Sequence, residues 1–464
     1  MLLSGLLLLL VCSTQASHFY GTVITYYPKN TNADGSVTVV LRYKLNFHSC
    51  TNASWACLSG NCGNESVIGG FVVDTEDSGN SIEWCQTETI STRLVPSNAP
   101  FLLVFASSGW IQGIKNGIVS WRAITLVELK NRSDTGRANS SPQTTMLPAV
   151  RVPSNCQRDF DLLAFDPDGD EVKCRYGNDS LFECNPCTPP SVLSLSPSCT
   201  LSFRPTNSSN EGPYAVQLVM EDFPRQTISL TQTNGLQEVK TTSDAISKIP
   251  LQFVVRVDPA VPSCTEGLYL PKFLPPTPAN RAQLYTAVNH KLEITINAEA
   301  TNSTIPTVLF SGPINVAKNT SGSGRFTLTW TPSEREDGES HPVCFVVQAL
   351  YNTIKYHSEL RCVIVNVGIV TSTDLPINMT APPINSTVAP TTITTQTTSP
   401  TTNLSNTIVV GLRMKISTSL PLTEETSNIF SQKLKEELMN RGLPSSIEVF
   451  VGSFGTVEVT TPAG

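Results

Sequence analysis

The chain has 464 residues, of which only 15% are charged, and its formal net charge is −7 at pH 7. It lacks a stripe of Lys and Arg that could meet a phosphate backbone, which argues against nucleic acid as a partner. Its 13 cysteines argue against a reducing compartment, because so many thiols are typical of exported, oxidised proteins.

The first residues are apolar, with a Leu run at 6–10 followed by the small residues Thr14 and Ala16. This pattern predicts a secretory signal peptide over residues 1–16, with the two small residues at the cleavage site. No later segment reaches the roughly 18 apolar residues that a membrane span needs. We therefore expect a secreted protein, or a cell-surface protein if an anchor follows Gly464.

Twelve cysteines remain once Cys12 leaves with the signal peptide, and an even number favours six disulfides without a free thiol. The twelve are Cys50, Cys57, Cys62, Cys85, Cys156, Cys174, Cys184, Cys187, Cys199, Cys264, Cys344 and Cys362. The first four lie in the middle of the N-terminal region, and the span 50–62 is crowded with Ser, Asn and Gly, which suggests a disulfide-stapled loop. Zinc is the alternative for these four, although their spacing includes no CxxC pair.

Asn-x-Ser/Thr sequons are frequent and fall mostly in turn-like segments, which predicts a heavily glycosylated exterior. They start at Asn52, Asn64, Asn131, Asn139, Asn178, Asn207, Asn302, Asn319, Asn378, Asn385 and Asn403.

Residues 17–130 read as a β-rich N-terminal domain, because 36–44 alternates with period two after a turn and further strand patterns follow. Trp110 and Trp121 flank a glycine-containing turn. Core packing is expected for at least one of the two rings, whereas an exposed ring would be a recognition anchor.

Residues 131–152 are polar and contain proline, which predicts a linker before a second domain at 153–262. Within that domain, Cys184 and Cys187 form a CxxC motif. Prolines rather than a helix follow it, so the helix N-terminus that lowers a thiol pKa is missing. We expect the two cysteines to serve in two structural bridges.

The segment 166–171, Asp-Pro-Asp-Gly-Asp-Glu, lies between two apolar stretches. Asp166, Asp168 and Asp170 could offer oxygen ligands to calcium, but the glycine and glutamate positions of an EF-hand do not match. The same residues also form a strong turn sequence, with Pro second and Gly fourth. A hairpin turn without metal is the preferred interpretation, and a calcium site between domains is the alternative. No other cofactor is expected.

One pattern occurs twice, about 127 residues apart. A strand pattern at 200–205 ends in an aromatic residue and a proline, and an apolar strand pattern returns at 213–220. The same order recurs at 327–332 and 342–349. This repeat predicts tandem β-sandwiches of roughly 100 residues, the later one at 263–368.

Several stretches of the sequence resemble known extracellular domains. The phrase at 164–170 and the strand end at 203–205 resemble the cadherin-like and immunoglobulin-like sandwich repeats of extracellular mosaic proteins. More narrowly, the runs 132–136, 152–156 and 326–332 resemble a set of secreted or cell-surface proteins abundant in bony fish. The resemblance covers residues 18 to about 367 and implies a fold without an activity. The calcium-binding Asp-x-Asn-Asp-Asn linker of cadherins is absent at 257–262.

Cysteine positions add two expectations. Cys344 and Cys362 lie on strands joined by a turn, so we predict that they pair. The second domain contains five cysteines, and Cys264 would complete its set with a bridge that ties the domain junction.

After Gly368 the composition shifts to Thr, Pro, Ser and Asn, which predicts a disordered, mucin-like linker over 369–407. Residues 408–464 then show strand and helix patterns. This small α+β unit resembles part of a SEA module, although its Gly-Ser turn at 452–453 matches the self-cleavage site of that family poorly. The expected class is therefore mainly β, with tandem sandwiches, a stalk and one small α+β unit.

The sequence lacks the Gly-x-Ser-x-Gly, His-Glu-x-x-His and phosphate-loop motifs, and its five histidines are scattered. We therefore expect no enzyme. The leading hypothesis is a glycoprotein ectodomain that binds an extracellular protein or glycan. The alternative is a structural or mucus-associated glycoprotein that acts through its sugars and stalk.

Overall fold

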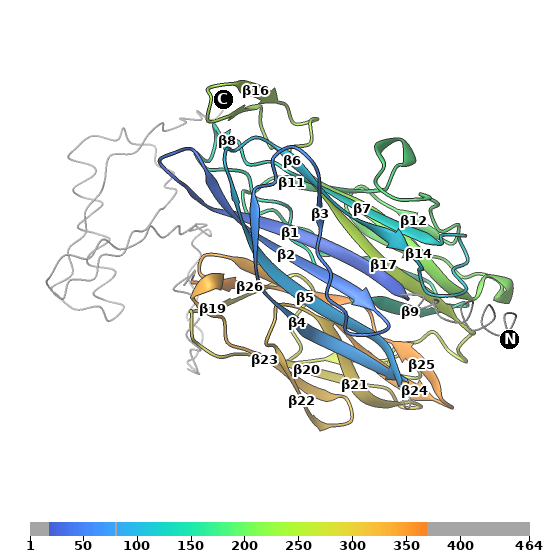
Figure 1. Ribbon diagram of the computed structural model, residues 1–464. Coiled ribbons are helices and arrows are strands. Elements are labelled where there is room, and N and C mark those ends of the chain that lie inside the picture. The colour runs from blue at the N-terminus through green and yellow to red at the C-terminus, as the bar shows by residue number, and fades with distance from the viewer. Residues whose placement is uncertain (1–17, 79–80, 369–464) are drawn as a thin grey trace, which may run out of the picture. The chain divides into compact units, whose positions relative to one another are not determined.

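The computed structural model describes residues 18–78 and 81–368, which all belong to one of two units of the chain, Met1–Val370. The expected signal peptide, stalk and C-terminal unit, at 1–16, 369–407 and 408–464, lie outside the described residues. The described part consists of strands, turns and three short 3₁₀ helices, so the mainly β class is confirmed (Figure 1). The helices are η1 (Asp179–Leu181), η2 (Ser208–Asn210) and η3 (Glu334–Glu336).

Two copies of one seven-strand sandwich follow one another in the chain. The first contains β9 (Ala149–Pro153), β10 (Arg158–Asp161), β11 (Glu171–Tyr176), β12 (Leu193–Leu195), β13 (Thr200–Phe203), β14 (Gly212–Phe223) and β17 (Lys248–Asp258). The second contains β19 (Ala282–Thr286), β20 (Leu292–Glu299), β21 (Thr304–Ser311), β22 (Ala317–Gly322), β23 (Arg325–Trp330), β24 (Ser340–Tyr351) and β26 (Arg361–Val367).

The strand orders of the two copies correspond one to one. In the first copy β10-β13-β12 packs on β11-β14-β17-β9, and in the second β20-β23-β22 packs on β21-β24-β26-β19. In each copy the first strand runs parallel to the last, and the other pairs are antiparallel. The predicted tandem repeat is therefore present in the topology as well as in the sequence.

The repeated pattern itself is an arch. β13 and β14 lie in different sheets and are joined through η2, and β23 and β24 are joined in the same way through η3. A proline follows each first strand and cannot donate to a ladder, so the strand ends there and the chain crosses the sandwich.

The N-terminal strands form the rest of the largest sheet. They are β1 (Phe19–Thr31), β2 (Val37–Phe47), β3 (Ala56–Ser59), β4 (Asn64–Ser78), β5 (Ser81–Val95), β6 (Phe101–Ser108) and β7 (Ser120–Val127). Their core is aromatic, with Trp110 and Trp121 both buried against Phe19 at ring distances of 4.8 and 4.4 Å. Both tryptophans are therefore core residues, and neither is an exposed anchor.

β17 joins the N-terminal strands to the first sandwich copy. It pairs along its length with β14 and also contacts β1 through Val23 and β7 through Leu126. Both regions consequently share one 11-stranded sheet. Smaller strands complete the fold: β8 (Asn131–Arg132), β15 (Ile228–Thr231), β16 (Gln237–Lys240), β18 (Lys272–Leu274) and β25 (Ile354–His357).

The segment 131–152, expected as a linker, is mostly buried between the N-terminal strands and the first sandwich copy. Its polar side chains bond to the backbone of neighbouring strands. Ser141 Oγ accepts from the Tyr26 backbone N–H at 2.8 Å, and Thr144 Oγ1 donates to the Leu163 carbonyl at 2.6 Å. Polar composition was a misleading guide here, because buried hydrogen bonds offset the loss of water.

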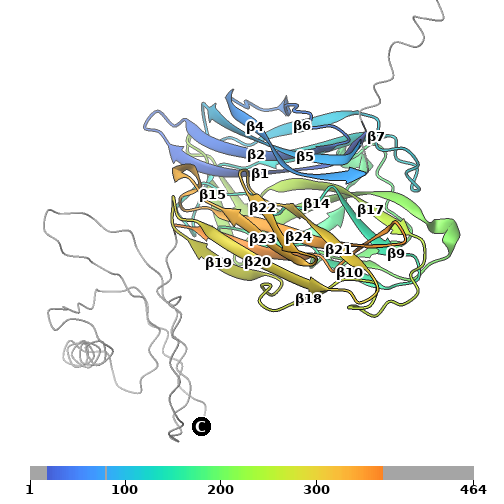
Figure 2. The ribbon, with the colours of Figure 1, turned by 90° about the horizontal axis from the view of Figure 1, so that it is seen from below.

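The second sandwich copy packs below the N-terminal strands, as Figure 2 shows. Buried ion pairs cross this contact. Arg42 on β2 donates to Glu336 and Glu339 at 3.0 and 3.1 Å, and Asp74 on β4 accepts from Lys318 at 2.7 Å. The described residues are thus held together by charged as well as apolar contacts.

Candidate functional site

The Asp-Pro-Asp-Gly segment forms the expected β-turn. The Gly169 N–H donates to the Asp166 carbonyl at 3.1 Å, and Gly169 has a φ of 88°. Asp166 Oδ1 also accepts from the Asp168 N–H at 2.8 Å. The turn is no hairpin, however, because it leads from the sheet of β10 to the sheet of β11.

Arg132 supplies a cation to this turn from the segment expected as a linker. Its side chain is fully buried, and all five of its N–H groups donate. It forms a fork with Asp170, a second fork with Asp134 at 2.8 and 3.0 Å, and a bond to Asn139 Oδ1 at 2.7 Å. This geometry leaves no donor free, so Arg132 is a fixed structural cation.

Asp222 on β14 completes the cluster. Its side chain is fully buried and accepts three hydrogen bonds, two from the N–H and Oγ of Ser247 at 2.7 and 2.8 Å and one from Asn139 Nδ2 at 2.9 Å. One oxygen each of Asp166, Asp170 and Asp222 lie within 4.8 Å of one another. This set differs from the predicted calcium ligands, because Asp168 instead accepts from the Ser140 N–H at 2.6 Å.

The cluster holds more carboxyls than cations. We use the name acidic cluster for five carboxyl residues and their cation, Arg132. The five are Asp134, Asp166, Asp168, Asp170 and Asp222. Burial raises the pKa of Asp222 to about 6. Burial, together with the neighbouring carboxylates, raises the pKa of Asp166 well above its usual range. Asp166 Oδ2 is shielded from water and has no hydrogen-bond partner, so this oxygen is where a proton belongs.

The carboxylates of the acidic cluster are better placed to share a proton than to coordinate a calcium ion. Calcium takes roughly six to eight oxygen ligands. Here Arg132 already holds both oxygens of Asp170, and Ser247 and Asn139 hold those of Asp222. Among the oxygens of the cluster that are shielded from water, Asp166 Oδ2 is the one without a hydrogen-bond partner.

We expect Asp166→Asn to raise stability at neutral pH and to flatten its pH dependence. A carboxyl with a raised pKa in the folded state contributes stability below its unfolded pKa and loses it as the pH rises through the folded pKa. The wild type should therefore become less stable as the pH rises above about 4 and through the raised pKa of Asp166, by up to about 1.4 kcal/mol per pH unit from this group. The substituted amide keeps the acceptor and adds a donor toward Asp222. Urea unfolding at pH 5 and pH 7.5 measures the difference.

The exposed Asp77→Asn, which also removes one carboxylate, should leave the pH dependence of the wild type unchanged. The calcium alternative makes the opposite prediction. If calcium raises the melting temperature of the wild type, and Asp166→Asn abolishes that rise, the cluster holds a divalent ion and the assignment of the proton is wrong.

Sequence reasoning missed Arg132, Asn139 and Asp222 as members of this cluster. They lie far from the turn in the sequence, and the sequence around Asn139 indicates only a glycosylation site. A signal existed for Asp222, because a carboxylate near the end of a long apolar strand needs a partner. The sequence holds no such signal for Arg132, because it lies in a polar stretch where a charged residue is expected to be exposed.

The sequons divide into exposed and buried sites. Asn139 is fully buried, and its Nδ2 donates to the Ser140 carbonyl and to Asp222, so the folded chain has no room for a sugar there. This corrects the expectation for Asn139. The other described sequon residues are exposed, namely Asn52, Asn64, Asn131, Asn178, Asn207, Asn302 and Asn319. Asn378, Asn385 and Asn403 lie outside the described residues.

All twelve cysteines of the described residues are paired. The bridges are Cys50–Cys85, Cys57–Cys62, Cys156–Cys264, Cys174–Cys199, Cys184–Cys187 and Cys344–Cys362. The pairing leaves no thiolate for the zinc alternative at the first four. Cys184 and Cys187 bond to each other, which corrects the expectation that they serve two separate bridges.

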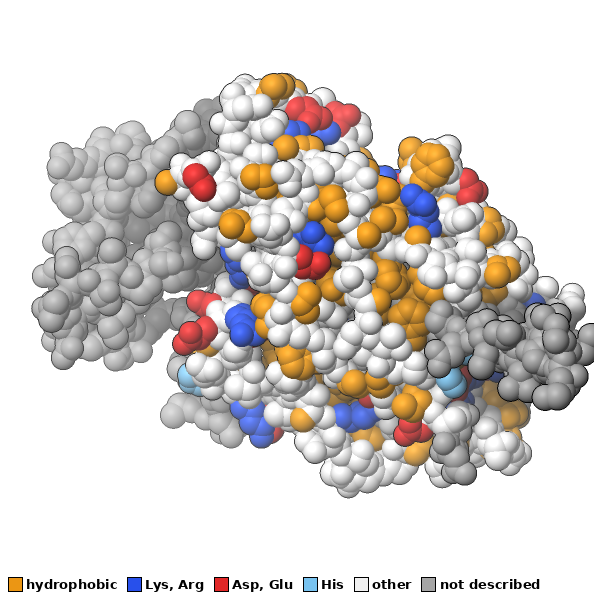
Figure 3. Space-filling view, viewed as in Figure 1, with side chains coloured by type: hydrophobic (Ala, Val, Ile, Leu, Met, Phe, Trp, Pro, Cys, Tyr) orange, Lys and Arg blue, Asp and Glu red, His pale blue; other side chains and the backbone are white. Residues whose placement is uncertain are grey.

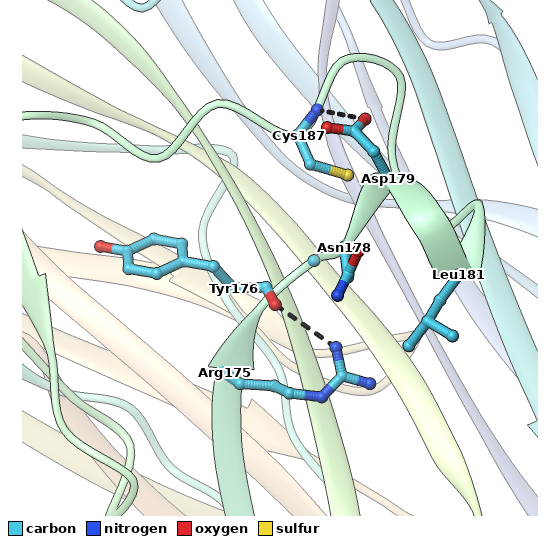
Figure 4. Close-up of a pocket in the computed structure, with 7 residues that line it drawn as sticks. Arg175, Tyr176, Asn178, Asp179, Leu181 and Cys187 are labelled. Carbon is cyan, nitrogen blue, oxygen red and sulfur yellow. Dashed lines mark hydrogen bonds between the residues drawn. The ribbon is translucent and has the colours of Figure 1, made fainter.

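A cavity of about 300 Å³ lies beside η1, where Arg175, Asn178, Asp179, Leu181 and Cys187 line it (Figure 4). Every N–H of Arg175 is engaged, by Glu183, Glu221 and the Tyr176 carbonyl. The charge of the Arg175 guanidinium is therefore balanced by two carboxylates, and all its donors are used. It is not free to bind an anionic ligand in the cavity.

β4 presents an uncharged, apolar edge. It ends the large sheet, and among the described strands it pairs with β5 alone. Its sequence carries no charge between Glu65 and Asp74, and the exposed apolar side chains there are Val67 (57%), Ile68 (38%), Phe71 (36%) and Val72 (52%). β-Bulges at 67–69 and 72–74 delimit this stretch, which we call the β4 edge. Figure 3 shows apolar side chains spread over this face with few charged ones among them.

Comparisons with known proteins give distant matches. No family model matches the chain. Integrin beta-like proteins C and E of Dictyostelium discoideum are 22% identical over 70% of this chain and 25% identical over 52% of it. The aligned regions make up 18% and 13% of those proteins, so the chain matches less than a fifth of the length of these curated relatives.

Among solved structures, immunoglobulin domains 1–4 of Sidekick-1 are 11% identical, with a TM-score of 0.15, over 66% of this chain and 70% of theirs. Human Protocadherin-24 EC1-2 is 12% identical, with a TM-score of 0.16, over 51% of this chain and all of its own. TM-scores this far below 0.5 carry no functional conclusion.

The location of the protein is constrained by its covalent structure. Six disulfides fit an extracellular or cell-surface location. Within residues 18–78 and 81–368, no helix is long and apolar enough to cross a membrane.

Proposed function

We propose that this chain is an extracellular, adhesion-type ectodomain that binds a protein partner, and that the β4 edge is its binding surface. The observation that carries the proposal is the exposure of four large apolar side chains on one uncharged edge strand. Soluble proteins protect such edges with charges, prolines or a covering element. An edge left apolar is suited to an added strand from a partner.

The chemistry of the β4 edge favours a protein over a glycan. Its side chains are aliphatic or aromatic, and Gly69 and Gly70 lie between them without a side chain. An extended apolar segment of a partner would pair with this backbone and bury Val67 and Val72. The matching partner is therefore an extracellular protein with an apolar strand or loop.

A sugar on Asn52 would compete for this surface. The Asn52 side chain lies beside Gly70, so close that a Cβ on Gly70 would meet it at 2.6 Å. Asn52 is exposed and belongs to a sequon. Removal of this sequon should strengthen binding at the β4 edge rather than weaken it.

We expect Val67→Lys/Val72→Lys to weaken saturable binding by at least roughly tenfold, because placing two charges in an apolar contact should cost more than about 1.4 kcal/mol. The probe is the full secreted chain on beads, titrated against immobilised extracellular matrix proteins, cell-surface ectodomains and an N-glycan array. Leu236→Lys/Val239→Lys, on the β15–β16 hairpin, is the matched control, because these side chains are 65% and 61% exposed.

Equal losses in the two double variants would show a nonspecific charge effect and contradict the role of the β4 edge. Saturable binding to the glycan array alone would assign the chain to a glycan ligand. If only deletion of residues 369–407 removed activity, the structural or mucus-associated alternative would replace the binding function.

A further inference from the structure

The cavity beside η1 contains a sequon asparagine in its own wall. Asn178 begins the sequence Asn-Asp-Ser, is exposed, and lines the cavity with Arg175 and Leu181 (Figure 4). We propose that this cavity holds the first N-acetylglucosamine of a glycan carried by Asn178, so that the sugar is a packed part of the fold. This inference is independent of the binding function above.

The Asn178 side chain is oriented for this role. Its Oδ1 accepts from the Ser180 N–H at 2.9 Å and from the Ser180 hydroxyl at 2.7 Å. Its backbone N–H donates to Glu183 at 3.1 Å. Because the Ser180 backbone donor requires an oxygen opposite it, the amide nitrogen must point the other way. Nδ2, the atom that carries an N-linked sugar, has no partner among the described residues.

The walls suit a neutral, polar ring. Arg175 is neutralised by Glu183 and Glu221, which removes the attraction for an anion. Asp179 accepts from the Cys187 N–H at 2.9 Å through Oδ1, which leaves Oδ2 to accept from a sugar hydroxyl. Leu181 is 48% exposed and offers an apolar contact to the ring or its acetyl methyl. A volume of about 300 Å³ is at the lower end for ligand sites and suits one sugar residue.

A neighbouring sequon provides the contrast. Asn207 caps η2 without a side-chain hydrogen bond, and it is also exposed. It does not line the cavity. A glycan on Asn207 would therefore extend into water, and its loss should leave the stability of the fold unchanged.

The test compares full chains secreted from cells that attach N-glycans. Glycopeptide mass spectrometry should find a glycan on Asn178. Endoglycosidase H, applied to high-mannose protein, should leave one N-acetylglucosamine and an unchanged melting temperature. Ser180→Ala, which abolishes the sequon, should lower the melting temperature by roughly 2–4 °C. Ser180→Thr, which keeps it, and Asn207→Gln should not.

A double-mutant cycle separates packing of the sugar from loss of the Ser180 hydroxyl. Leu181→Ala should lower the melting temperature in the glycosylated chain but have a smaller effect once Ser180→Ala has removed the sugar. Additive shifts in the cycle would overturn the proposal. The proposal would also be wrong if Asn178 carried no sugar in the secreted, folded chain.

Discussion

Arg132→Met should cost roughly 3–5 kcal/mol of unfolding free energy, because it leaves the carboxylates of a buried cluster without their cation. Arg132 is fully buried, and its five N–H groups are shared by Asp134, Asp170 and Asn139. Methionine fills a similar volume but supplies no donor. Urea unfolding at pH 7.5, followed by tryptophan fluorescence, measures the loss.

Acid should partly rescue this variant. Without Arg132 the nearby carboxyls bind protons more tightly in the folded state, so the deficit should shrink as the pH falls toward about 4. Arg281→Met is the control, because Arg281 pairs with Asp161 at a surface where the two side chains are 41% and 38% exposed. That change should cost at most about 1 kcal/mol. Equal losses at the two sites would contradict a buried, paired cluster.

Removal of the Cys156–Cys264 bridge should cost more stability than removal of a bridge that closes a short loop. The bridge closes a loop with a sequence separation of 108, whereas Cys57–Cys62 has a separation of 5. In the chain-entropy description, the two losses are roughly 4–5 and about 2 kcal/mol. The double variant Cys156→Ser/Cys264→Ser should therefore unfold at clearly lower urea concentration than Cys57→Ser/Cys62→Ser.

The folded junction should survive this change. Asn155 Nδ2 donates to the Val261 carbonyl at 2.8 Å, and its Oδ1 accepts from the Val261 N–H at 2.9 Å. These contacts hold the junction without the bridge, so the loss should come mainly from the freer unfolded chain. If a protease cleaves the variant and the wild type at 259–263 at equal rates under native conditions, the junction is folded in both. Equal urea midpoints for the two double variants would contradict the role of loop length.

The repeated sandwich could be recognised from the sequence because its signals are local. An aromatic residue with a proline two positions later ends a strand at Phe203 and at Trp330, and alternation of apolar side chains marks the strands on either side of each arch. The predicted pairing of Cys344 with Cys362 is confirmed, but the turn after β24 leads to β25, and Cys362 lies opposite Cys344 on β26.

The acidic cluster was only half visible in the sequence. The turn at 166–169 is encoded by its own residues, Pro167 and Gly169 among them. Whether its carboxylates meet calcium, a proton or a guanidinium depends on what other segments bring to them. Arg132 and Asp222 come from 34 positions before and 56 positions after Asp166, and no short-range pattern specifies that meeting.

By itself, then, the sequence determined a disulfide-bonded chain with two successive β-sandwiches, because strand periodicity, turn residues and cysteine number act over short distances. Only the tertiary structure decided that residues 138–152 are buried, that Asn139 is closed to sugars and that β17 joins two regions in one sheet. Those outcomes depend on hydrogen bonds between segments far apart in the chain. A polar residue is buried or exposed according to whether such partners reach it, which its neighbours in the sequence do not reveal.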